Sequence, residues 1–102
     1  MKPTTLNKLV HLDGMLQDEL CLTLDDFFHT SVHTGDIRLQ WSSRNQKTLV
    51  FSELMQKMDA ISKFSYIEEY SSEWNTEHHW FDIRFKIQYD SANWYEVNIV
   101  VH

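Results

Sequence analysis

The sequence predicts an α+β fold. One domain over residues 1–102 is expected to hold an antiparallel sheet of about four to five strands, ending in a three-stranded meander, with about two to three helices on one face. Residues 80–102 alternate apolar with polar side chains, as the strands of a hairpin do, whereas residues 6–20 and 54–61 carry apolar side chains at helical spacing. The chain of 102 residues has one proline, two glycines and no internal repeat, so it is long enough for one core and shows no linker.

The N-terminal part of the chain predicts two helices. The first is expected to begin within residues 3–5, because threonine caps free amide groups and proline is tolerated in a first turn. Its apolar stripe runs over residues 6–20, and Gly14 either bends the helix or ends it. The pair Thr23 and Asp26 has the spacing of a capping box, which predicts a second, short helix.

The middle of the chain predicts a strand and a further helix. Residues 37–41 alternate in the manner of a strand. Residues 48–51 are read either as a returning strand, which their propensity favours, or as the start of the next helix. Ser52 is a suitable cap for that helix, whose apolar face lies within residues 54–61 and which is expected to end near Ser62.

A third strand is predicted at residues 64–74, joined to the following strand by a four-residue loop, 76–79. This register places Glu69 opposite Lys86. A five-residue loop would instead place Glu68 opposite Lys86 and turn two other carboxylates toward the core. Because burying carboxylates is costly, the four-residue loop is preferred.

The final hairpin, residues 80–102, allows each face to be assigned. Matching its two apolar sets requires an odd-length loop, and a loop of residues 91–93 satisfies this, with Asn93 in the left-handed conformation. In that register Ile87 lies opposite Val97. The predicted core face of the hairpin consists of Phe81, Ile83, Phe85, Ile87, Tyr89, Tyr95, Val97, Ile99 and Val101.

The charge of the chain restricts its partners. The formal net charge is -6 at pH 7, and the basic residues concentrate in residues 37–64, flanked by acidic segments. A nucleic-acid backbone requires a cationic field, so nucleic acid is an unfavoured partner and a basic protein is a better one.

Targeting and redox signals are absent from the sequence. Residues 1–10 lack the uninterrupted apolar stretch of a signal peptide, and no stretch approaches the length of a membrane span. The single cysteine, Cys21, lies among leucines and is expected to be a small buried side chain. We therefore expect a cytoplasmic protein that does not associate with membranes.

Two histidine pairs are candidate chemical sites. His29 and His33, near Asp25 or Asp26, would share one side of a helix and could bind a metal, but no further ligand spacing supports this. Adjacent to Glu77 are two further histidines that could act in acid or base catalysis, although no catalytic motif accompanies them: His78 and His79. The sequence therefore predicts no enzyme, no metal and no cofactor.

The outer face of the meander is the predicted binding surface. Tryptophan and arginine are frequent anchors of protein interfaces, and this face combines them with carboxylates. The alternative is that another element covers these side chains. The predicted partner-binding residues are Glu69, Glu73, Glu77, Trp80, Arg84, Lys86, Trp94 and Glu96.

Together these features predict a small acidic protein-binding module. Bacterial immunity proteins and other inhibitor-like antagonists of basic, nucleic-acid-acting proteins fit this description by charge and size, because carboxylates and aromatic anchors can block a basic cleft. One alternative is a homo-oligomeric accessory or chaperone-like domain, a homodimer that pairs through the C-terminal strand if that strand lies at a sheet edge. Another is a small enzyme that uses His78 or His79.

Overall fold

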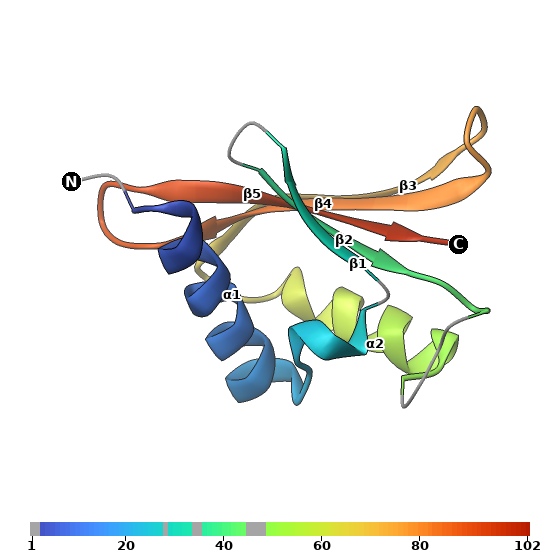
Figure 1. The fold of residues 1–102 in the computed structure, drawn as a ribbon, viewed down its shortest axis with the longest axis horizontal. Helices are drawn as coiled ribbons and strands as arrows, with labels where there is room; N and C mark the ends of the chain where they lie inside the picture. The colour runs from blue at the N-terminus through green and yellow to red at the C-terminus, as the bar shows by residue number, and fades with distance from the viewer. Residues whose placement is uncertain (1–2, 28, 34–35, 45–48) are drawn as a thin grey trace.

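The computed structural model describes residues 3–27, 29–33, 36–44 and 49–102. Two α-helices lie against one face of a five-stranded sheet, which confirms the α+β class and the predicted placement of the helices on one side (Figure 1). The elements are α1 (Thr5–Leu20), the short 3₁₀ helix η1 (Leu24–Asp26), β1 (His29–His33), β2 (Asp36–Trp41), α2 (Phe51–Ile61), β3 (Ile67–Asn75), β4 (Trp80–Gln88) and β5 (Trp94–Val101).

The sheet is mixed, so the prediction of a purely antiparallel sheet is wrong. Its strand order is β1-β2-β5-β4-β3, and β2 runs parallel to β5, whereas the predicted C-terminal meander of β3, β4 and β5 is confirmed. The strand β5 is therefore a central strand and not an edge strand. This position suits its composition, because Ile99, Val100 and Val101 are all buried. A homodimer formed through the C-terminal strand would need an edge that β2 and β4 already occupy.

The first helix follows its sequence signals. Thr4 is its N-cap, and the side chain of Thr4 accepts a hydrogen bond from the backbone N–H of Asn7 at 3.1 Å. Gly14 does not end α1, which continues to Leu20. The helix ends at Cys21, which is exposed and adopts a left-handed conformation with φ of 54°. The prediction of a buried Cys21 is therefore wrong, because a C-cap position lies outside the apolar stripe of the helix.

The segments that follow α1 were predicted less accurately. The capping box is confirmed, since the backbone N–H of Thr23 donates to the Asp26 carboxylate at 2.9 Å at the start of η1. Helix α2 begins at Phe51 with Val50 as its N-cap, so the predicted cap at Ser52 is wrong. Of the two readings left open for residues 48–51, Phe51 fits the start of the helix and none of residues 49–51 is in a strand; Thr48 lies outside the described residues. The strand propensity of this segment does not decide its structure, because Leu49 is buried in the core and this tertiary contact outweighs local preference.

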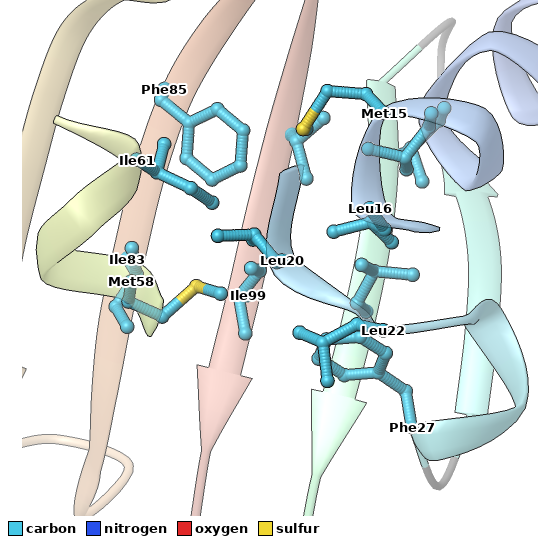
Figure 2. Packing of buried hydrophobic residues seen from close by; sticks show 14 of the residues in the cluster. Met15, Leu16, Leu20, Leu22, Phe27, Met58, Ile61, Ile83, Phe85 and Ile99 are labelled. Carbon is cyan, nitrogen blue, oxygen red and sulfur yellow. The ribbon is translucent and has the colours of Figure 1, made fainter. Parts of the chain in front are cut away.

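The core lies between the helices and the sheet. Met15, Leu16 and Leu20 of α1 and Met58 and Ile61 of α2 meet side chains of the central strands (Figure 2). Met58 is fully buried, as expected for an adaptable core side chain. The strand residues labelled in Figure 2 are Ile83, Phe85 and Ile99.

The hairpin β4–β5 has the predicted faces but not the predicted register. Ile87 lies opposite Tyr95 and not opposite Val97, a shift of two residues. The backbone N–H of Tyr89 donates to the carbonyl of Asn93 at 2.8 Å, so the three-residue loop consists of residues 90–92. Asn93 is not left-handed, which corrects the predicted turn.

The Asp90 carboxylate determines where this loop closes. It accepts hydrogen bonds from the backbone N–H groups of Ala92 and Asn93, each at 2.8 Å. These bonds, first of all the one from Ala92, lower the pKa of Asp90. An aspartate side chain that satisfies two loop amides stabilises a turn without a left-handed residue.

The pair β3–β4 combines both registers considered from the sequence. Near the turn the four-residue loop is confirmed, since Trp74 lies opposite Phe81, whereas at the other end Glu68 lies opposite Lys86. A β-bulge between Glu68 and Ser71 joins the two registers, so the predicted pairing of Glu69 with Lys86 is replaced by a bulge. Glu69, within the bulge, has a φ of 55°.

We expect Glu69→Gly to leave the free energy of unfolding unchanged or to raise it by up to about 1 kcal/mol. A left-handed residue other than glycine costs about 1–2 kcal/mol, and glycine removes this cost. The exposed ion pair that the substitution also removes contributes less than about 1 kcal/mol. The matched control is Glu68→Gly, in the regular part of the same strand, which should lose roughly 0.5–1 kcal/mol. Urea unfolding followed by circular dichroism measures both. Equal destabilisation by the two variants would contradict the bulge.

Candidate functional site

The face of the sheet opposite the helices is the candidate site, and the strand registers place its side chains in rows. One row crosses all five strands, because adjacent members are direct cross-strand partners. Its two arginines flank Asn98 of β5 on either side. This central row consists of Ser31, Arg38, Asn98, Arg84 and Ser71.

Beside the central row lies a charge network around Lys86. The Lys86 Nζ atom is 3.2 Å from the Glu69 carboxylate and 4.0 Å from that of Glu96. The hydrogen bond and charge of Glu69, followed by the charge of Glu96, raise the pKa of Lys86. The bulge is what carries Glu69 to this lysine, because it adds a residue to β3 at that point.

On the other side of the central row, Asp82 is held by two amide side chains. Asn75 Nδ2 donates to Asp82 Oδ2 at 3.0 Å, and Asn98 Nδ2 lies 3.4 Å from Asp82 Oδ1. Burial alone would raise the pKa of Asp82, but these hydrogen bonds, with contributions from Trp80 and Arg84, outweigh it and lower the pKa. Asp82 is therefore a charged acceptor in the wall of the face, next to Trp80.

The far end of the β3–β4 hairpin turns away from the helix layer (Figure 1). Trp74 lies there on the helix side of the sheet, but neither α1 nor α2 covers it, and 51% of its surface is exposed. Its ring meets Phe81 edge to face, with centroids 5.2 Å apart. Glu73 and Glu77, both exposed, flank this aromatic pair along the chain. The alternation pattern placed Trp74 on the core face and so missed it as a surface anchor; its position next to the turn is the signal that could have revealed it.

The eight predicted partner-binding residues do not form one patch. Trp80 and Trp94 lie at opposite ends of the open face. Trp94 is paired with Gln88, which is eight residues beyond Trp80 on β4. At about 3.4 Å per residue, the two tryptophans are separated by roughly 27 Å along the strand. One group, at the hairpin end, consists of Glu73, Glu77 and Trp80. The other, at the opposite end, consists of Glu69, Lys86, Trp94 and Glu96, with Arg84 between the two groups.

The structure places one histidine pair in an edge strand and the other in a turn. His29 and His33 stand in β1, and four strand residues span roughly 13 Å, so the helical spacing assumed for a shared metal is wrong. No group of three or more described His, Cys, Asp or Glu side chains could hold a metal ion. His78 stacks on Trp80 with centroids 4.5 Å apart, and His79 is an exposed turn residue with φ of 58°.

A histidine that the sequence did not single out joins α1 to β5. His11 Nδ1 and the Tyr95 hydroxyl are 2.7 Å apart, beside a hollow of about 500 Å³ that includes Gly14. Burial lowers the pKa of His11 and raises that of Tyr95, so both groups are held in their neutral forms. We interpret this pair as a hydrogen bond that attaches α1 to the sheet.

The chain matches no protein-family model, and no curated protein or solved structure matches it significantly. Among the described residues, no helix combines the length and apolar character needed to cross a membrane.

Proposed function

We propose that this protein is a non-catalytic binding module that attaches to a basic protein through the end of its β3–β4 hairpin. The observation that carries the proposal is the exposure of Trp74, of which 51% is accessible, at a hairpin end that also carries two exposed carboxylates. Glu73 lies on the opposite face of the strand from Trp74, and Glu77 lies in the turn. Large aromatic side chains are frequent hot spots of interfaces, and surrounding carboxylates select a cationic partner.

The charge of the open face supports the same kind of partner. Six acidic residues and three basic ones lie on that face by strand register, which leaves a net charge of -3. The acidic residues are Asp36, Glu68, Glu69, Glu73, Asp82 and Glu96, and the basic ones are Arg38, Arg84 and Lys86. If the basic surface of the partner serves nucleic-acid binding, its occupation would make this protein an antagonist of the immunity-protein or inhibitor class.

The test is capture of partners from the native host with three purified, tagged proteins. The hairpin variant carries Trp74→Ala, Glu73→Lys and Glu77→Lys. The control variant carries Glu53→Lys and Asp25→Lys, which reverse the same number of charges at exposed sites outside the sheet. We expect the natural sequence and the control to retain a protein of net positive charge, and the hairpin variant to bind it at least roughly thirtyfold more weakly, as loss of a hot spot does.

Binding of that partner should also weaken as salt is raised from low to physiological concentration, because exposed charges are screened. Capture that is equal for the hairpin variant and the control, or capture only of acidic proteins, would contradict the proposal. Circular dichroism spectra of all three proteins exclude loss of folding as the cause.

A further inference from the structure

A hollow of about 420 Å³ lies on the open face, over the central row, well within the range of about 300–1,000 Å³ that small-ligand pockets occupy. Side chains from four strands line it, so the rigid part of the sheet and not a loop forms its floor. The hollow is separate from the exposed hairpin end, because neither Trp74 nor Glu77 lines it.

The two arginines of the hollow are available to an anion. Arg38 and Arg84 flank Asn98 on neighbouring strands, so their Cα atoms lie about 10 Å apart at about 4.8 Å per strand. Both side chains rise from the same face and are long enough to meet over Asn98. Among the described residues, the ion pairs within 4.0 Å involve lysines and neither of these arginines. A planar guanidinium binds carboxylates in a bidentate manner, and two of them can hold one carboxylate from both sides.

Two carboxylates, those of Asp36 and Glu96, also line the hollow. Ile37 of β2 is paired with Val97 of β5, so the residues that precede them, Asp36 and Glu96, are also neighbours. Both lie two residues before the central row, a distance of about 7 Å along the strands. The nearby cation, Lys86, is closer to Glu69 at 3.2 Å than to Glu96 at 4.0 Å, which leaves Glu96 incompletely neutralised.

We propose that this hollow binds a small zwitterion of the amino-acid class, with its carboxylate between Arg38 and Arg84 and its ammonium group against Asp36 and Glu96. A phosphate or a nucleic-acid backbone fits less well, because the carboxylates of the hollow would repel it. A simple carboxylate or a simple amine would leave one of the two charged rows without a partner.

The test is a titration of the ¹⁵N-labelled protein followed by NMR, with the backbone amides of β2, β4 and β5 and the arginine Nε–H groups as reporters. The probes are 4-aminobutyrate with its single-charge counterparts butyrate and butylamine, glycine with acetate and methylamine, and inorganic phosphate. At least one zwitterion should bind at least about tenfold more tightly than both of its counterparts and than phosphate, because each half adds charge-assisted hydrogen bonds.

Variants locate the site. Arg38→Gln, Arg84→Gln and Glu96→Gln should each weaken binding of the zwitterion by about tenfold or more. Arg44→Gln is the matched control, because Arg44 lies outside the hollow and its loss should change nothing. Arg38→Lys keeps the charge but not the bidentate geometry and should give an intermediate loss, which separates ligand binding from folding.

The proposal is overturned by three results. The first is the absence of any NMR shift with either zwitterion at roughly 10 mM, a concentration at which even a weak specific site is occupied. The second is binding of butyrate, acetate or phosphate that is as tight as that of the zwitterions. The third is a loss of zwitterion affinity in Arg44→Gln as large as that in the variants of the hollow. None of these results bears on the hairpin end, so the two proposals fail independently.

Discussion

Substitution of Ile99 by proline is expected to leave the chain largely unfolded. Ile99 is fully buried and lies between Leu39 of β2 and Ile83 of β4, its direct cross-strand partners. Proline removes a backbone donor that a central strand needs, which leaves a buried carbonyl unpaired at a cost of about 1–3 kcal/mol. It also forces φ near -65°, and the resulting backbone strain adds about 1–3 kcal/mol. Loss of the isoleucine packing adds roughly 2 kcal/mol or more. The sum is comparable to the total stability of a small domain, about 5–15 kcal/mol.

The measurement is urea unfolding followed by circular dichroism, with Ile99→Val as the matched control. Valine keeps the backbone donor and the β-branched shape, so it should cost only about 0.5–1.5 kcal/mol. A proline variant that unfolds cooperatively at the same urea concentration as the natural sequence would show that β5 is not a central strand. The same placement removes the free edge assumed for a homodimer through the C-terminal strand, and the edges of the described sheet are β1 and β3.

Replacement of Trp41 by alanine is the second change with a large expected effect, a loss of about 3–5 kcal/mol. Trp41 is the largest fully buried side chain and 1% of it is exposed. Its indole Nε1 donates to the carbonyl of Leu49 at 3.3 Å, and its ring lies 5.9 Å from that of Phe51, centroid to centroid. Trp41 thus attaches the start of α2 to the end of β2, so its truncation opens a cavity and leaves a buried carbonyl unpaired.

Trp41→Phe separates these two contributions. Phenylalanine retains most of the buried apolar surface but cannot donate to Leu49, so the expected cost is about 1–3 kcal/mol. Free energies of unfolding from urea titrations give both values, with circular dichroism as the signal because the substitutions alter tryptophan fluorescence. A loss below about 1 kcal/mol for Trp41→Ala would be incompatible with its burial.

The local elements of this protein could be predicted because their causes are local. Thr4 and Thr23 cap helices through hydrogen bonds to residues three positions away, and these bonds need nothing from the rest of the fold. Alternation with a period of two likewise assigned the faces of β4 and β5, since one side of each strand must be buried. The same alternation correctly placed Arg84, Lys86 and Glu96 on the face away from the core.

Strand register was predicted only up to a shift of two residues. Such a shift keeps every side chain on its own face, so periodicity does not distinguish Ile87 opposite Val97 from Ile87 opposite Tyr95. The choice is made by the hydrogen bonds of Asp90 in the loop. The bulge at Glu69 has a similar cause, because β3 satisfies one register near its turn and another at its far end, and neither alone buries the correct side chains.

By itself, then, the sequence determined the caps of α1 and η1, the C-terminal meander and the buried faces of β4 and β5. Only the tertiary structure decided that β5 lies between β2 and β4, that the hairpin end carries an uncovered Trp74, and that Arg38 joins Arg84 across one hollow. These features depend on contacts between residues far apart in the chain, such as Arg38 and Asn98. Capping and alternation depend on a few neighbouring residues. Pairing between distant strands depends instead on which arrangement buries the apolar faces of all the helices and strands in one core.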